Sequence, residues 1–234
     1  EPQPQTLPEP AMRAAVAPPR AEQAPVPRVE QALPPRPALL DRAAAPRADV
    51  SQLDWAGLQA AVASCTACDL CRTRSHAILG DGDERGEWLF VSAAPSADDD
   101  AAGIPLAGER GALMDNMLRA TGLNRIHNTY LTPAVKCRPV DAAGRDRAAT
   151  EEERAACRPF LERQVALMRP RVIVVLDGTH PLAGTPLPHG TVARHGDSAV
   201  LAVADPQTLL DTPLAKAQAW QALCLARKTH AGSA

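Results

Sequence analysis

The 234-residue sequence has few aromatic side chains, little net charge and no long apolar run. Phe, Trp and Tyr make up 3% of the residues, so alanine, valine and leucine must form most of any core. The net charge of −2 gives no general attraction to nucleic acid, although a local basic face can still form. No window holds the ~18 apolar residues that span a bilayer. These absences favour a globular protein without a membrane span.

The sequence also lacks the basic start and apolar run of a secretory signal, and it begins at Glu1. Six cysteines in a chain without such a leader argue against a disulfide framework and fit thiolates in a reducing cytoplasm. We therefore expect a cytoplasmic, monomeric protein whose cysteines bind a metal centre. Cys224 is the exception, because it fits a small buried apolar residue.

Residues 1–48 differ in composition from the rest of the chain. They hold 12 of the 23 prolines, and the pairs Pro18-Pro19 and Pro34-Pro35 favour extended backbone. Their apolar surface is too small to offset the entropy cost of folding. We expect a disordered Pro/Ala-rich tail at 1–48 and one domain at 49–230. A tether or a ligand for a protein partner are alternative roles for the tail.

Apolar runs and helical patterns alternate along residues 49–230. The expected strands are residues 88–91, 130–132, 172–176 and 199–203, and the expected helices begin near Ser51, Glu109, Thr150 and Thr212. Thr150 with Glu153 has the spacing of a capping box. The alternation predicts an α/β fold, a three-layer α/β/α sandwich around a four-stranded parallel sheet. Such sheets bind ligands at the carboxyl ends of their strands.

Four cysteines have the pattern of a metal centre. The turn Cys65-Thr66-Ala67-Cys68 puts two sulfurs within reach of one centre, and Cys137 and Cys157 can complete the ligand set. This spacing suits an iron–sulfur cluster and also suits zinc, so both stay open from the residues alone.

Several motifs occur in a characteristic order between about residues 60 and 225. They are Cys65-x-x-Cys68-x-Leu70-Cys71-x-x-Arg74, Lys136-Cys137-Arg138-Pro139, Glu152-x-x-x-x-Cys157, and the segments 158–164 and 170–174. Together they resemble the family 4 uracil-DNA glycosylases, the iron–sulfur branch of the uracil-DNA glycosylase superfamily. The resemblance implies the superfamily's fold and a [4Fe–4S] cluster held by Cys65, Cys68, Cys137 and Cys157. Cys71 matches a position that is often cysteine but is not a usual ligand, and the polar insertion at 141–149 is longer than is typical.

The resemblance also implies four catalytic positions, and each is replaced in this sequence. A water-positioning Glu is Ala93, a base-stacking Phe is Leu106, a uracil-reading Asn is Pro133, and a His that stabilises the uracil anion is Asp205. Asp99 and Asp100 are candidate substitutes if their loop folds back. The alternative for these two residues is a solvated acidic turn.

We therefore expect a glycosylase-like iron–sulfur protein of DNA repair, a pseudoenzyme in which uracil excision is weakened or lost. The basic residues expected to contact DNA are Arg72, Arg74, Lys136 and Arg138. One alternative is an active glycosylase that uses Asp99, Asp205 or a nearby histidine (His180, His189 or His195). Another is a non-enzymatic iron–sulfur or zinc module for interaction or redox chemistry, with a partner recruited by the tail.

Overall fold

The computed structural model describes residues 49–232, so the tail predicted at 1–48 lies outside the described residues. The described part contains one sheet of six strands in the order β1-β3-β2-β4-β6-β5. The strands are β1 (Asp81–Gly82), β2 (Trp88–Ser92), β3 (Thr129–Pro133), β4 (Val172–Val175), β5 (Val192–His195) and β6 (Ser198–Ala202). The four central strands are parallel, and β1 and β5 pair antiparallel at the two edges.

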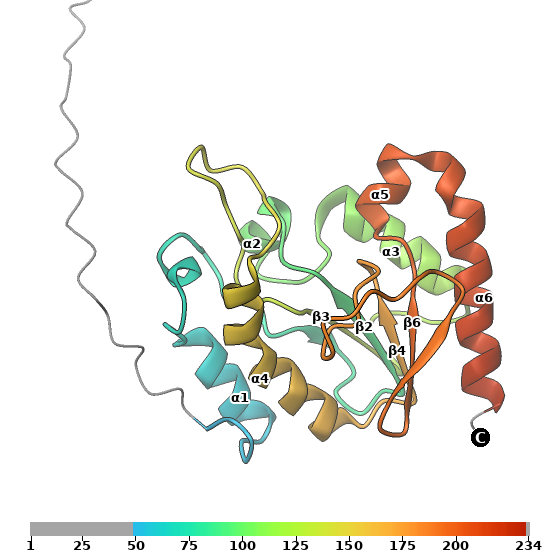
Figure 1. The fold of residues 1–234 in the computed structure, drawn as a ribbon, viewed down its shortest axis with the longest axis horizontal. Coiled ribbons are helices and arrows are strands. Elements are labelled where there is room, and N and C mark those ends of the chain that lie inside the picture. Colours follow the sequence, from blue (N-terminus) through green and yellow to red (C-terminus); the bar gives the residue numbers. More distant parts are fainter. Residues whose placement is uncertain (1–48, 233–234) are drawn as a thin grey trace, which may run out of the picture. The chain divides into compact units, whose positions relative to one another are not determined.

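Helices cover both faces of this sheet (Figure 1). One face carries α3 (Gly108–Ala120), α5 (Pro206–Asp211) and α6 (Lys216–Gly232), and the other carries α4 (Glu151–Met168), with α1 (Trp55–Ala63) packed against α4. The short helix α2 (Ala97–Ala102) follows β2, and 3-10 turns occupy Asp69–Arg72 and Pro213–Ala215. The expected three-layer architecture with a parallel four-stranded centre is therefore confirmed.

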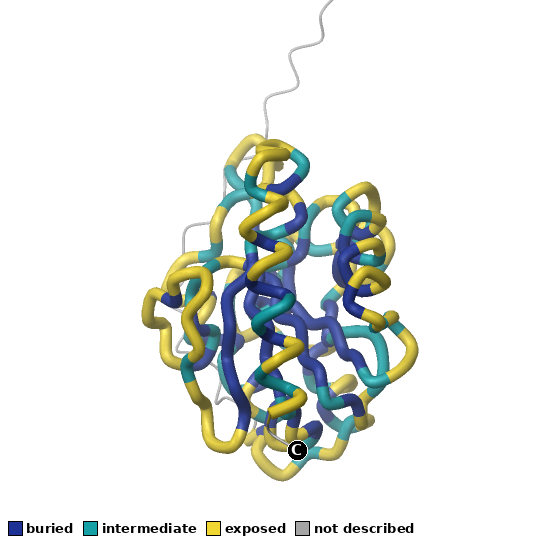
Figure 2. Tube along the Cα trace, turned by 90° about the vertical axis from the view of Figure 1, so that its right-hand side faces the viewer, coloured by how far each residue is buried: buried dark blue, intermediate teal, exposed yellow. Residues whose placement is uncertain are grey.

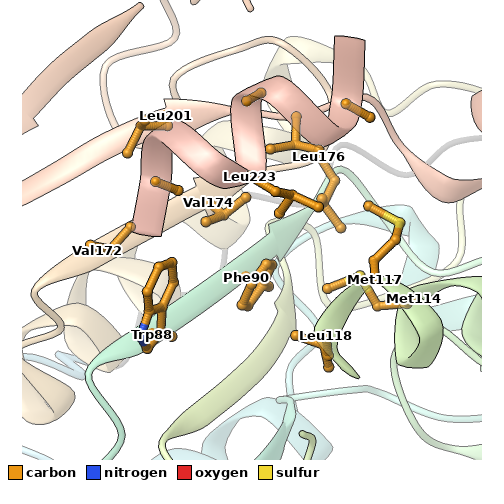
Figure 3. Packing of buried hydrophobic residues seen from close by; sticks show 14 of the residues in the cluster. Trp88, Phe90, Met114, Met117, Leu118, Val172, Val174, Leu176, Leu201 and Leu223 are labelled. Carbon is orange, nitrogen blue, oxygen red and sulfur yellow. The ribbon is translucent and has the colours of Figure 1, made fainter. Parts of the chain in front are cut away.

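The central strands divide their side chains between two cores because successive residues of a strand point to opposite faces. Trp88 and Phe90 pack with Met114 of α3 and Leu223 of α6, as Figure 3 shows. Leu89 and Val91 belong to the opposite core, which includes residues of α4. Figure 2 shows the consequence: the central strands are buried, while the helices keep exposed outer surfaces. Burial on both faces explains why these strands are continuous apolar runs.

The structure adds elements that the sequence patterns did not predict. The edge strand β5 is largely exposed and has no apolar run to mark it. Asp205 accepts a hydrogen bond from Gln207 N and begins the unpredicted helix α5, while the last helix starts at Lys216 rather than near Thr212. Within residues 49–232, no helix is long and apolar enough to cross a membrane.

Candidate functional site

A pocket of about 710 Å³ opens where the parallel strands end. Its wall includes Ala93 after β2, Ala134 after β3, Asp177 after β4 and Gln207 in α5, which follows β6. Ligand sites of open α/β sheets lie at this edge. The pocket is therefore the candidate functional site.

Ala93 presents a methyl group to this pocket. The residue is exposed on the pocket wall, and its carbonyl accepts a hydrogen bond from Val135 N at 3.1 Å. This bond links the loops after β2 and β3. The residue has no group that could orient water.

Leu106 and Pro133 are both buried and are not among the residues that line the pocket. Leu106 is 1% exposed and packs in the core that contains Phe90. Its φ of 54° lies in the left-handed region, which non-glycine residues rarely adopt, and Arg125 donates to its carbonyl at 2.6 Å. Pro133 ends β3, and its carbonyl accepts a hydrogen bond from Lys136 Nζ. Neither position offers an aromatic face or an amide to a ligand.

Asp205 is held by Arg110 at the pocket. Arg110 donates to both carboxylate oxygens of Asp205, at 3.0 and 2.8 Å, and its Nη1 lies 3.5 Å from Asp99 Oδ2. The side chains of Arg110, Asp205 and Asp99 are 12%, 18% and 1% exposed. Bidentate arginine–carboxylate pairs fix geometry as well as charge. Asp205 is thus a capping and pairing residue, and Arg110 rather than Asp205 lines the pocket.

Asp99 and Asp100 are buried, so the expected solvated acidic turn is wrong for both. Asp99 forms a capping box with Ser96 and also accepts from Ala107 N at 2.7 Å. Asp100 accepts from Ser75 N and His76 N, each at 2.9 Å. Burial alone would raise the pKa of Asp100, but these N–H donors hold the pKa below its ordinary value. Both carboxylates therefore join loops to α2.

Seven charged side chains that the sequence patterns did not single out also line the pocket. The arginines are Arg110, Arg147, Arg154 and Arg158, and the acids are Asp146, Glu151 and Asp177. Arg147 pairs with both oxygens of Glu153, at 2.8 and 2.6 Å, and Glu153 in turn caps α4 with Thr150. The spacing of Arg154 and Arg158 on one helical face was the available signal. The insertion supplies Asp146 and Arg147, so it forms part of this wall.

Asp177 and His180 are the titratable side chains of the loop after β4 that line the pocket. Asp177 is exposed on the pocket wall, and desolvation by the protein around it, together with nearby Asp205, raises the pKa of its carboxyl despite the hydrogen bond that Thr179 N donates. His180 is 5% exposed, and burial and nearby His195 lower the pKa of its ring. The amide groups of Leu182 and Ala183 donate to His180 Nδ1 at 3.3 and 3.0 Å, which leaves Nε2 as the protonated nitrogen of the neutral ring. Of the three histidines considered from sequence, His180 is the one among the pocket-lining residues.

A second cavity brings the cysteines together. It is lined by Cys65, Cys68, Cys71, Cys137 and Cys157, and also by Arg74 and Lys136. Cys137 and Cys157 are each 3% exposed, and the other three are half-buried. Arg74 Nη1 donates to Cys137 Sγ at 3.0 Å, and Lys136 N donates to Cys157 Sγ at 3.5 Å. Cys224 lies half-buried on α6 rather than fully buried as expected.

The cysteine cavity has the donors of a metal centre and positive charge beside them. Burial raises the pKa of Cys137, and raises that of Cys157 to about 12, so thiolates there need a cation to form. Among residues 49–232, no group of three or more His, Cys, Asp or Glu side chains is placed to hold one metal ion. A four-iron cluster takes one thiolate on each iron, so its ligand sulfurs stand farther apart than those around one ion.

The four basic residues expected at DNA have different surroundings. Lys136 is 1% exposed and donates to Gln164 Oε1 at 2.6 Å and Thr132 Oγ1 at 2.7 Å, so it cannot reach a phosphate. Burial lowers the pKa of Lys136 to about 7. Arg74 is bound to Cys137 and to the carbonyl of Ala63.

The other two residues are nearer the surface: Arg72 is exposed and Arg138 is half-buried. Arg72 pairs with Asp69 at 3.5 Å, and its side chain is 63% exposed. Arg138 pairs with Asp146 at 2.5 Å, and its side chain is 21% exposed. The predicted basic edge is therefore reduced to Arg72 and Arg138.

Comparison with known proteins agrees with this architecture. Residues 79–225 match the model of the uracil DNA glycosylase superfamily. The type-4 uracil-DNA glycosylase of Archaeoglobus fulgidus is 40% identical over 115 residues, which are 49% of this chain and 55% of that enzyme. The type-4 uracil-DNA glycosylase of Thermotoga maritima is 37% identical over 118 residues, which are 50% of this chain and 59% of that enzyme. The chain spans about half the length of the curated relatives it matches. It belongs to the uracil-DNA glycosylase superfamily.

Proposed function

We propose that this chain is a DNA-binding, glycosylase-like iron–sulfur protein of DNA repair in which uracil excision is weakened or lost. The observation that carries the proposal is the wall of the 710 Å³ pocket. Ala93 offers a methyl group there, and Asp205 is held by Arg110. A uracil glycosylase needs a group that positions water and a donor for the departing uracil anion.

The expected loss of rate is large because several groups are replaced together. Removal of one group that stabilises developing negative charge typically costs about 10²–10³ in rate. Such effects are not additive, but the groups act as a unit, so the loss of several leaves little catalysis. Asp205 has no hydrogen-bond donor to offer a uracil anion, and it pairs with the pocket-lining Arg110 instead.

The cysteine cavity supports a [4Fe–4S] cluster as the cofactor. Cys65, Cys68, Cys137 and Cys157 would hold it, and the N–H donors on Cys137 and Cys157 are of the kind that tune cluster sulfurs. When bound, such a cluster would cross-link the segment around residues 65–74 to α4 and could also carry an electron. Zinc is the alternative, and iron, sulfide and zinc content of the protein purified without oxygen would separate the two.

An active glycosylase with an unconventional site is the second candidate, and the loop after β4 favours it. Asp177 and His180 both line the pocket, and the raised pKa of Asp177 is the kind of perturbation found at catalytic carboxylates. In this version Asp177 would orient water, and His180 Nε2–H would donate to the leaving base. Asp99 and Asp205 are weaker candidates for such a role because Arg110 lies beside both.

Uracil release from DNA separates the two candidates. We expect cluster-loaded protein to release no uracil from single- or double-stranded DNA above a protein-free control, while it retards DNA in a gel with an affinity that falls as salt rises. Robust release would overturn the main proposal. If Asp177→Asn or His180→Ala then abolished that release, the second candidate would be established. Absence of DNA binding at low salt would favour the interaction module instead.

A further inference from the structure

Five cysteines line the cysteine cavity, whereas a four-iron cluster needs only four thiolate ligands. The additional cysteine is Cys71. Cys71 lies three residues after Cys68, as Cys68 lies three residues after Cys65. The segment is therefore two overlapping CxxC turns that share Cys68. A cysteine on the outer surface could not serve as a cluster ligand, but Cys71 lines the same cavity as the other four cysteines.

The five thiols fall into two groups by burial. Cys137 and Cys157 are fixed in the interior, one after β3 and the other within α4, and each is 3% exposed. Cys65, Cys68 and Cys71 are half-buried and come from one short segment. If the buried pair supplies two ligands, three thiols of the short segment compete for the two remaining irons.

The segment is anchored by two side chains, Leu70 beside Cys71 and Arg74 after it, while its backbone hydrogen bonds are long. Leu70 is buried against Cys137 and Cys157, and Arg74 is tied to Cys137 Sγ and to the carbonyl of Ala63. The 3-10 turn that carries Cys71 has long hydrogen bonds, with 3.4 Å from Cys71 N to the carbonyl of Cys68. Hydrogen bonds of that length are longer than the normal ~2.7–3.2 Å, so the backbone bonds themselves resist a small rotation of the turn only weakly.

We propose that Cys71 is a reserve cluster ligand that replaces Cys65, so that either CxxC turn completes the four-thiolate set. The exchange moves one thiolate off an iron and another on, without a change of oxidation state. This inference rests on the cluster assignment proposed above. Cys68 belongs to both turns, so without it no CxxC pair remains.

The test uses Cys65→Ser, Cys71→Ser, the double variant and Cys68→Ser, each in the full chain and purified without oxygen, with Cys224→Ser as the control. Iron and acid-labile sulfide are measured per chain. We expect the two single variants at positions 65 and 71 to keep a cluster, and the double variant and Cys68→Ser to lose it. If Cys65→Ser loses iron as completely as the double variant, the inference is wrong.

Alkylation followed by mass spectrometry gives a readout at the residue itself and does not depend on the yield of folded protein. In native cluster-loaded wild-type protein, Cys71 should react with iodoacetamide, and in loaded Cys65→Ser protein it should be protected. Continued reaction of Cys71 in the loaded variant would refute the exchange while leaving the cluster intact. Wild-type protein without iron and sulfide would overturn the cluster assignment and this inference together.

Discussion

Arg110 lies between the carboxylates of Asp99 and Asp205, and its removal is expected to lower the stability of the fold strongly. In Arg110→Ala, Asp99 and Asp205 would lose their shared cation, with side chains only 1% and 18% exposed. Breaking a buried ion pair by removing one partner costs about 3–5 kcal/mol, because a charge stays buried without compensation. For a domain of this size, each kcal/mol corresponds to roughly 2–4 °C in Tm.

The expected result is therefore a fall in Tm of about 6–20 °C. Urea denaturation followed by circular dichroism measures the free energy of unfolding directly. The matched control is Arg72→Ala, whose pair with Asp69 is exposed on both sides and should cost less than about 1 kcal/mol. Asp205→Asn combined with Arg110→Ala should recover part of the loss, because it removes one of the stranded charges. A loss below about 1 kcal/mol in Arg110→Ala would refute the account of this network.

Three further predictions concern the buried acid, the pocket and the DNA-contacting residues. Asp100 has a pKa below its ordinary value of 3.8, so its stabilising effect is present above that value and is lost as pH falls through the folded pKa. Urea titrations should therefore show that Asp100→Asn is less stable than wild type at pH 7 and that the difference shrinks below about pH 4. A constant difference would contradict that origin. Ala93→Glu places a carboxylate in the pocket and should raise uracil release above wild type, whereas Ala97→Glu on exposed α2 should not; equal release by both would show that Ala93 does not limit the chemistry. Lys136→Met leaves the buried acceptors of Lys136 without a donor, so it should cost about 1–3 kcal/mol of stability and leave the salt dependence of DNA binding unchanged. Arg72→Ala should instead reduce the salt dependence of DNA binding without loss of stability. The reverse pattern would show that Lys136 contacts a phosphate.

Much of the fold could be predicted from the sequence because its signals are local. The run at 172–176 is apolar and β-branched, and it forms the buried strand β4. Thr150 and Glu153 form the predicted capping box at the start of α4. Cys65 and Cys68 of the predicted turn line one cavity with Cys137 and Cys157, while their role as cluster ligands stays a prediction.

The misses share a physical cause, which is that tertiary contacts decide the surroundings of charged residues. A run of aspartates usually faces water, but Asp100 is buried because the amide groups of Ser75 and His76 reach it from another segment. Lys136 stands beside a cysteine in sequence, yet its ammonium points to Gln164 of α4. Arg110 was not predicted as a site residue because its partner Asp205 is distant in the chain. Edge strand β5 was missed because its four residues are largely exposed and form no apolar run.

The most direct test of the central claim is uracil release by protein whose iron and sulfide content has been measured on the same sample. We predict a full cluster complement, DNA binding that weakens with salt, and no uracil release above the protein-free control. Robust uracil release by cluster-loaded protein would contradict the claim that this pocket has lost ordinary excision.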